Sequence, residues 1–224
     1  MTQPGFAVHA VRRLVNDEQI SRFSSFAVSS ISDALSRTNG TTHLRSFHRG
    51  ETVIGRALTV KTMPGDNLMV HKAIDMAAPG DVIVVDAGGQ LFNATIGELM
   101  STYARSRGVA GFVIDGAIRD RSSLALSDFP VFARGVSHRG PSKQGPGEIN
   151  VPVCVDAMVV MPGDLVVGDA DGVLSIRPEQ LDPLAILVQE IEDKERLLLA
   201  DIVAGTVDRA WVDEILRSKG VSGV

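Results

Sequence analysis

The chain has 224 residues, 44% of them hydrophobic, and a formal net charge of −5 at pH 7. That length allows one large domain or two small ones with a proper core. The acidic balance argues against nucleic acid as a partner, because a phosphate-binding surface needs a basic excess. The single cysteine excludes an intrachain disulfide, and no apolar run has the length of a signal peptide or membrane span. We therefore expect a cytoplasmic protein with no membrane partner.

Hydrophobic periodicity predicts the elements in chain order. A helix is expected over 17–35, where Ile20, Phe23, Ala27 and Ile31 share one face. Strands are expected over 52–62, 82–86, 109–114, 131–136, 151–155, 165–168 and 173–176. Further helices are expected over 67–77, 95–107, 122–126, 178–204 and 208–217. Cys154 lies in the apolar run VPVCV and is expected in the core. The alternation of strands and helices in the middle predicts parallel βαβ units, with added strands after residue 150.

One tripeptide recurs along the chain and predicts turns. The tripeptide Pro-Gly-Asp occurs at 64–66, 79–81 and 162–164. Proline presets the first central position of a turn and glycine accepts positive φ at the second, so these are predicted turns rather than a catalytic motif.

The polar stretch 137–150, rich in Gly and Pro, is a long loop of the kind that is often functional. Its Arg139 and Lys143 could read the distal end of a ligand or only seal an interface.

The first candidate site is the stretch NATIGELM, residues 93–100. Thr95 and Glu98 have the spacing of a capping box. Gly97 lies in the first turn of the expected helix, where a glycine is explained if another group must approach the backbone closely. The N–H groups of Gly97, Glu98, Leu99 and Met100 could hold a small anion at the start of the helix. The alternative is a capped helix with an incidental glycine.

The second candidate is the pair Arg119-Asp120, where the strand GFVI gives way through Asp115-Gly116 to a helix. Arginine can bridge two oxygens of a carboxylate or enolate, and aspartate offers the hard oxygen ligands that Mg²⁺ and Mn²⁺ prefer. The alternative is an exposed ion pair at a helix start. In a parallel sheet the edge that carries this pair would adjoin the edge that carries Gly97.

The third candidate is Glu195, which interrupts an apolar stripe on the long C-terminal helix. Either Lys194 and Arg196 neutralise it there, or it adds an acid to the site of another subunit. The five histidines show no spacing typical of a metal site.

These motifs together resemble one family. The segments GELMSTYARSRGVAGFVIDGAIRD and PGDLVVGDADG are similar to the class II 4-hydroxy-4-methyl-2-oxoglutarate / 4-carboxy-4-hydroxy-2-oxoadipate aldolases, a family that also contains the regulator of ribonuclease E activity. The resemblance covers about residues 25–200, within a single expected domain over 1–224, and residues 206–224 form a C-terminal extension outside it. It implies an α/β fold, an αββα sandwich resembling the swivelling phosphohistidine domain, assembled as homotrimers or homohexamers with active sites between subunits.

The resemblance also implies a reaction. It is divalent-metal-dependent retro-aldol cleavage of a 4-hydroxy-2-keto acid to pyruvate and a keto acid, with oxaloacetate decarboxylation as a side activity. Carried over by residue, substrate lies on Gly97, Glu98, Leu99, Met100 and Arg119, and Arg119, Glu98 and Asp120 are catalytic. Asp120 would bind Mg²⁺ or Mn²⁺ directly or through water, with Glu98 and the Glu195 of a neighbouring subunit acting through water. The alternative is a non-catalytic binding protein like the ribonuclease regulator, which an acid at position 98 disfavours.

Overall fold

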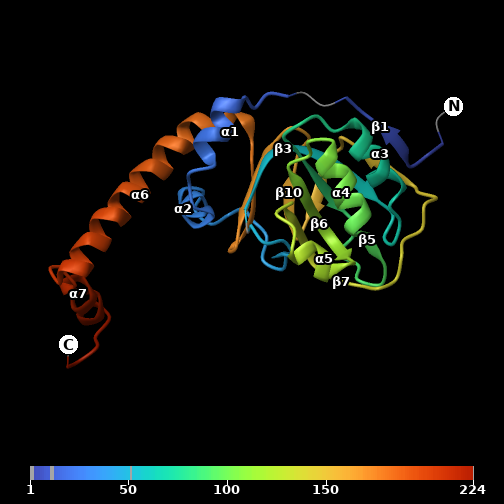
Figure 1. The fold of residues 1–224 in the computed structure, drawn as a ribbon. Helices are drawn as coiled ribbons and strands as arrows, with labels where there is room; N and C mark the ends of the chain where they lie inside the picture. The colour runs from blue at the N-terminus through green and yellow to red at the C-terminus, as the bar shows by residue number, and fades with distance from the viewer. Residues whose placement is uncertain (1–2, 11–12, 51, 224) are drawn as a thin grey trace.

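The computed structural model describes residues 3–10, 13–50 and 52–223. Its large sheet is built on four parallel strands, hydrogen-bonded in the order β3 (Val53–Thr62), β4 (Asp81–Asp86), β6 (Gly111–Ile118) and β7 (Val131–Val136) (Figure 1). The apolar side chains of β4 and β6 are fully buried, as expected of parallel strands covered on both faces. The predicted βαβ arrangement is therefore confirmed. None of the helices in the described ranges combines the length and apolar character that crossing a bilayer requires.

Shorter strands complete the β structure. They are β1 (Phe6–Val8), β2 (Arg45–Ser46), β5 (Ala94–Ile96), β8 (Gly147–Ile149), β9 (Val153–Val155), β10 (Met158–Val160), β11 (Leu165–Asp169) and β12 (Gly172–Ile176). β8 and β1 extend the sheet beyond β3, β2 lies outside β7, and β5 runs parallel to β6. The strands β11 and β12 are antiparallel to their neighbours, as the β-rich segment after residue 150 allowed. The strands that the sequence did not predict, β1, β2, β5, β8 and β10, are too short to show periodicity.

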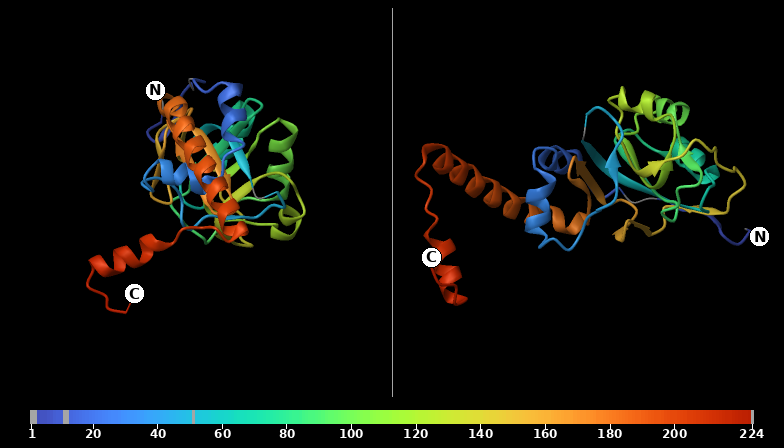
Figure 2. Two further views of the ribbon diagram at one scale, coloured as in Figure 1. Left: turned by 90° about the vertical axis from the view of Figure 1, so that its left-hand side faces the viewer. Right: turned by 90° about the horizontal axis from the view of Figure 1, so that it is seen from below.

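The two faces of the sheet are covered differently. Helices α3 (Leu68–Met76), α4 (Glu98–Ser106) and α5 (Arg121–Ala125) contribute apolar side chains to the cluster on one face. The antiparallel β9–β10 hairpin supplies the other, through Val153, Val155, Met158 and Val160. Figure 2 shows the same layers from two further directions. The αββα layering and the likeness to the swivelling phosphohistidine domain stay predictions.

A third apolar cluster joins the N-terminal helices to the C-terminal one. α1 (Asp17–Phe23), α2 (Val28–Ala34) and the start of α6 (Leu181–Ala204) pack on the β11–β12 hairpin. The prediction of one helix over 17–35 is wrong. The hydroxyls of Ser24 and Ser25 donate to carbonyls three residues back, and Ala27 is extended, so the chain turns between two short helices.

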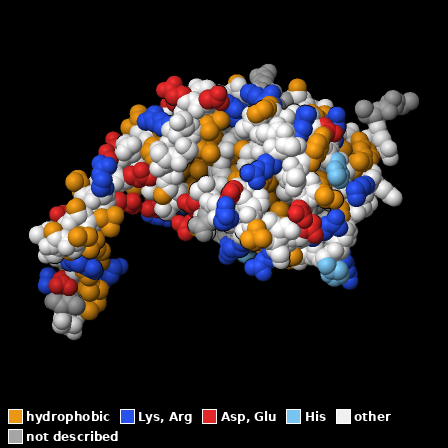
Figure 3. All heavy atoms as spheres, in the orientation of Figure 1, with side chains coloured by type: hydrophobic (Ala, Val, Ile, Leu, Met, Phe, Trp, Pro, Cys, Tyr) orange, Lys and Arg blue, Asp and Glu red, His pale blue; other side chains and the backbone are white. Residues whose placement is uncertain are grey.

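The C-terminal helices leave the body of the molecule. A 3₁₀ turn (Pro178–Gln180) leads into α6, whose buried residues all lie at or before Val188. The rest of α6 projects outward and is followed by α7 (Ala210–Ser218), which Figure 1 shows at the far end. Figure 3 shows hydrophobic side chains at the surface of this arm. Leu198, Ile202 and Trp211 are among the exposed residues. The arm thus has no covering partner within the described chain.

Two local expectations are corrected. Cys154 is exposed rather than buried, because β9 alternates and places its neighbours Val153 and Val155 inward instead. The strand expected to stop at Ile114 continues to Ile118, since Ala117 and Ile118 pair with β7 on one side and β5 on the other. The longer strand brings its end directly to Arg119.

Candidate active site

Two strand-to-helix junctions lie side by side at one edge of the sheet. β5 leads through Gly97 into α4, and its parallel neighbour β6 leads through Arg119 and Asp120 into α5. Ile96 pairs with Ile118, so the two residues that follow each strand are neighbours in space. The adjacency predicted from the sequence is confirmed. Such an edge is where ligands bind in open α/β sheets.

Gly97 has no room for a side chain. A Cβ at this position would lie 2.3 Å from Asp120 Oδ2 and 2.8 Å from Arg119 Cγ, both below any real contact distance. The backbone there is extended, with φ of −153°, so the requirement for glycine is steric and not conformational. The glycine therefore allows the Arg119-Asp120 junction to approach the start of α4.

The predicted capping box is wrong. Thr95 lies buried inside β5, and the N-cap of α4 is Gly97, which makes no side-chain cap. Pairing with β6 holds residues 94–96 in the strand, which overrides the local capping signal. The start of α4 is capped from another element instead, because Glu98 N donates to Asp120 Oδ2 at 3.0 Å.

Asp120 is held in a sparsely populated conformation. Its φ of +57° and ψ of +37° place it in the left-handed region, which non-glycine residues occupy mainly in turns and at functional sites. Arg119 Nε lies 3.7 Å from Asp120 Oδ2, too far for a hydrogen bond, and both side chains are about two-fifths exposed, at 42% and 40%. The pair is thus an open one, and each group retains capacity for a ligand.

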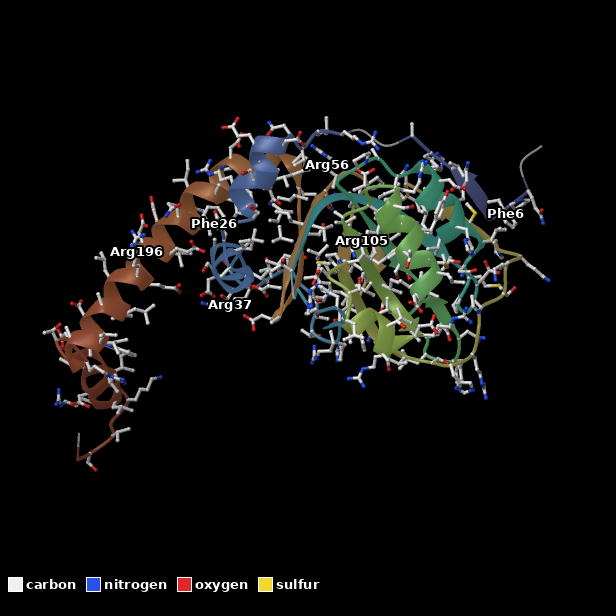
Figure 4. All side chains as sticks on the ribbon, viewed as in Figure 1. Phe6, Phe26, Arg37, Arg56, Arg105 and Arg196 are labelled. Atoms are coloured by element: carbon white, nitrogen blue, oxygen red, sulfur yellow. The ribbon has the colours of Figure 1, made fainter. Side chains whose placement is uncertain are left out.

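A cavity of about 170 Å³ opens at this edge. It is lined by Asn67, His71, Thr95, Ile96, Gly97, Leu99, Met100, Arg119, Pro141 and Lys143. Three of the four predicted cradle residues therefore share one cavity with Arg119. Glu98 does not line it; its side chain lines a neighbouring groove of about 280 Å³, together with Arg105 of α4, Ser123 and Leu126. Figure 4 labels Arg105 on the body of α4. Asp120 is not among the lining residues of either hollow, and its link to this edge is the N–H that its carboxylate accepts from Glu98.

Sequence reasoning missed Asn67 as part of the site. Its side chain is 2% exposed, and its Nδ2 donates to Thr95 O at 2.9 Å and approaches Met100 Sδ at 3.2 Å. Its Oδ1 has no hydrogen-bond partner within the described part of the chain. A buried acceptor without a donor costs free energy, which a ligand hydroxyl or water in the cavity would recover. An asparagine as the first residue of a predicted helix gives no sign of a buried polar group, which hid this role.

His71 and Lys143 give the cavity its titratable wall. The sequence predicts no role for His71. Burial, together with the nearby positive charge of Lys143, lowers the pKa of His71, and Asp75 opposes this only in part. The imidazole is therefore neutral at pH 7 and able to accept a proton or hydrogen bond. Lys143 was one of the two loop cations weighed as ligand-reading groups, and the structure places it on the cavity wall.

Glu195 does not reach the cavity of its own chain. It is exposed on the projecting part of α6, where Figure 4 labels the next residue, Arg196. Arg196 forms an ion pair with Asp193 at 2.8 Å, so one of the two neutralising partners weighed for Glu195 is engaged elsewhere. The role of Glu195 in a neighbouring subunit stays a prediction.

The residues present fit a water-rich hard cation rather than a closed metal site. Within residues 3–10, 13–50 and 52–223, no group of three His, Cys, Asp or Glu side chains is arranged to hold an ion. Mg²⁺ needs no such group, since it keeps several waters and is bound through one or two carboxylates. Asp120 supplies one accessible carboxylate beside the cavity.

Known proteins share both the sequence and the fold. The family model described as "RraA-like: Aldolase/RraA" matches residues 28–175. A provisionally named 4-hydroxy-4-methyl-2-oxoglutarate aldolase of Halalkalibacterium halodurans is 46% identical over 204 residues, which covers 88% of this chain and 95% of that protein.

Solved structures of other proteins have a similar fold. An uncharacterized protein from Pseudomonas syringae matches with a TM-score of 0.78 and 25% identity, over 86% of this chain and 96% of that one. The RNA-processing inhibitor RraA from Thermus thermophilis matches with a TM-score of 0.62 and 30% identity, over 67% and 92% of the two chains. With a family match over more than half of its length, the chain belongs to the Aldolase/RraA family.

Proposed function

We propose that this chain is a divalent-metal-dependent aldolase that cleaves a 4-hydroxy-2-keto acid to pyruvate and a second keto acid. The 4-hydroxy-4-methyl-2-oxoglutarate or 4-carboxy-4-hydroxy-2-oxoadipate type is the substrate class, as the name of the H. halodurans relative suggests. The observation that carries the proposal is that Arg119 and the start of α4 line one cavity, and that the next residue, Asp120, accepts the N–H of Glu98 at the same edge of the sheet. Metal dependence and oxaloacetate decarboxylation are part of the same proposal.

The substrate would be held by its 2-keto acid end. Its carboxylate would lie on the N–H groups at the start of α4, near Leu99 and Met100, where the helix dipole favours an anion. The Arg119 guanidinium would then face the keto oxygen from the adjacent junction. Asn67 Oδ1, which lacks a donor, would accept a hydrogen bond from a hydroxyl of the substrate or from water.

The bond change is a retro-aldol cleavage. A base removes the proton of the C4 hydroxyl, C4 becomes the carbonyl carbon of the leaving keto acid, and the C3–C4 bond breaks. The two electrons of that bond form the enolate of pyruvate, whose oxyanion Arg119 stabilises. A proton added at C3 gives pyruvate. His71, neutral at pH 7 and on the cavity wall, is suited to carry the proton directly or through a water.

Asp120 would hold Mg²⁺ or Mn²⁺, with Glu98 and the Glu195 of a neighbouring subunit reaching its water shell. When bound, the cation supplies Lewis-acid stabilisation of the developing enolate oxygen. The exposed arm of α6 and α7 is compatible with a homotrimer or homohexamer in which one subunit's arm meets another's site. We also propose that the protein acts in the cytoplasm.

The test is pyruvate formation from oxaloacetate and from 4-hydroxy-4-methyl-2-oxoglutarate, coupled to a dehydrogenase, with and without Mg²⁺, Mn²⁺ and a chelator. Oxaloacetate loses CO₂ in place of a keto acid and leaves the same enolate. The aldolase proposal expects turnover that disappears with the chelator and returns with added metal. Turnover that persists in full after chelation would contradict the metal dependence.

A second candidate function follows from the RraA structure of T. thermophilis, which is titled as an RNA-processing inhibitor. Under that reading the chain binds and masks an RNA-degrading enzyme and forms no pyruvate from any 2-keto acid. Glu98 favours catalysis, because an acid at this position suits a metal's water shell. Absence of turnover on the whole substrate panel, together with binding to a ribonuclease, would favour the second candidate.

A further inference from the structure

The three Pro-Gly-Asp tripeptides form the same turn. In each, the aspartate N–H donates to the carbonyl three residues before it, from Asp66 to Met63, Asp81 to Ala78 and Asp164 to Met161. The central glycines have φ of +82°, +84° and +88°, as the turn chemistry predicts. All three aspartate side chains are buried, at 1%, 2% and 2% exposure. The copies therefore share their backbone and their burial.

The three aspartate carboxylates accept hydrogen bonds from different N–H groups. Asp81 accepts the N–H of Ala78 at 2.9 Å, and Asp164 accepts the N–H of Met161 at 2.9 Å, so each closes its own turn. Asp66 does not close its turn. Its Oδ1 accepts the N–H of Leu68 at 2.8 Å, and its Oδ2 accepts the N–H of Gln144 at 2.7 Å, from a segment 78 residues away.

Gln144 belongs to the segment 139–146, which forms one wall of the cavity. Backbone hydrogen bonds also hold this segment, with Ser142 N donating to Gly65 O at 2.8 Å and Asn67 N to Ser142 O at 3.0 Å. Asn93 Nδ2 also donates to Gly140 O, at 2.6 Å. The bond to Asp66 is distinct because its acceptor is a buried carboxylate, and bonds to charged groups are the stronger class.

This segment contacts both cationic groups of the cavity. Pro141 and Lys143 line the cavity directly. A Cβ built on Gly140 would lie 3.2 Å from Arg119 Nη1, so the backbone of the segment also backs the Arg119 guanidinium. Because Lys143 belongs to the segment itself, a change in how the segment is held would move Lys143 relative to the start of α4.

We propose that Asp66 is a positioning residue of this site, which fixes the segment 139–146 so that Lys143 stands on the cavity wall. The carboxylate is ionised in the fold. Burial opposes its charge, but hydrogen bonds from Leu68, Gln144, Gly145 and Ser142 outweigh burial and lower the pKa of Asp66. An asparagine there would present an amide that can satisfy at most part of these donors.

The experiment compares Asp66→Asn with Asp164→Asn, the same tripeptide at the same burial but away from the cavity. Amide hydrogen exchange and the rate of acylation of Lys143 are both measured by mass spectrometry. They report how firmly the segment 139–146 is held, and neither measurement needs a substrate. For Asp66→Asn we expect exchange at Gln144 and Gly145 to rise at least about tenfold, as loss of charge-assisted bonds implies. Lys143 acylation should change as well. Asp164→Asn should leave both unchanged.

Kinetics then ask whether Asp66 acts through Lys143, a step that rests on the proposed aldolase function. Asp66→Asn should lower kcat/KM at least about tenfold in the wild-type background and less than about twofold in a Lys143→Ala background, since the two act as a unit. An equal loss in both backgrounds would overturn the positioning role, as would unchanged exchange at 139–146.

The positioning role can still be tested if Asp66→Asn does not fold or if the wild-type protein shows no turnover. If Asp66→Asn does not fold, Gln144→Pro removes one donor while Asp66 remains, and it should loosen the same segment. A wild-type protein that turns over no 2-keto acid would defeat the aldolase proposal, yet the exchange and acylation results would still decide whether Asp66 holds the segment.

Discussion

The backbone N–H of Glu98 donates to the carboxylate of Asp120, with 3.0 Å between the two heavy atoms. This bond joins the start of α4 to the start of α5 and crosses between two neighbouring parallel strands. The Asp120 carboxylate thus does what a side-chain cap would do for α4, while its left-handed backbone turns the chain into α5. The two junctions therefore form one unit.

Arg119→Ala should lower kcat about 10²- to 10³-fold with a much smaller change in KM, because its strongest contact forms as the enolate develops. Pyruvate release measured at saturating substrate checks this. Arg49→Ala is the matched control, since Arg49 forms an exposed pair with Asp128 away from the cavity and should keep full activity. Turnover of Arg119→Ala near that of the wild type would refute the role of the guanidinium.

Gly97→Ala should inactivate the site without unfolding the protein. The added methyl group would meet Asp120 Oδ2 at 2.3 Å, so the carboxylate must move and its bond to Glu98 N must break. Loss of activity with a Tm shift of only a few degrees is the expected pattern. Gly50→Ala is a suitable control, because a Cβ there meets only His48 Cδ2, at 3.8 Å. Equal activity losses in both variants would contradict the steric explanation.

The pH profile should report His71. Its pKa lies below the ordinary value of 6.5, so the neutral imidazole predominates above that pH and kcat/KM should be flat there before falling on acidification. Lys143→Ala removes the positive charge that contributes to this lowering. The acid limb of the profile should therefore move to higher pH in that variant, while removal of Asp75, which raises the pKa, should move it lower. An acid limb that neither change displaces would exclude His71 as the titrating group.

Asp156 should make the fold sensitive to acid. Hydrogen bonds from the Thr42 and His43 backbone and from the His43 ring, with the charge of Arg134, outweigh burial and lower the pKa of Asp156 to about 2. Since the folded pKa is below the unfolded one, the stabilisation is complete above about pH 4 and is lost as pH falls to about 2. It amounts to about 2 kcal/mol in the free energy of unfolding.

Chemical denaturation at pH 7 and at pH 2.5 checks this for wild type and Asp156→Asn. The variant should be less stable at pH 7 and should lose less stability on acidification. Asp33→Asn, which removes an exposed partner of Arg37, is the control and should change neither value by more than about 0.5 kcal/mol. An identical pH dependence for wild type and Asp156→Asn would show that other groups dominate.

The sequence by itself determined the parallel core and the candidate residues at its edge. Runs such as Val82–Val85 are apolar on both faces, which only a covered parallel strand explains, and the period of α3 and α4 is helical. The parallel sheet predicted the cradle and the Arg119-Asp120 pair at adjacent edges, and the resemblance in GELM and GAIRD assigned both to one site.

Tertiary structure alone decided how those groups meet. Thr95 has a capping pattern that β5 pairing overrides, packing leaves Asn67 Oδ1 without a hydrogen-bond donor, and Asp66 reaches Gln144 across 78 residues. Local periodicity reports which face a residue presents within its own element, because it arises from backbone geometry a few residues long. It carries no information on which distant donor or acceptor a side chain finds, and in this protein those distant contacts build the cavity.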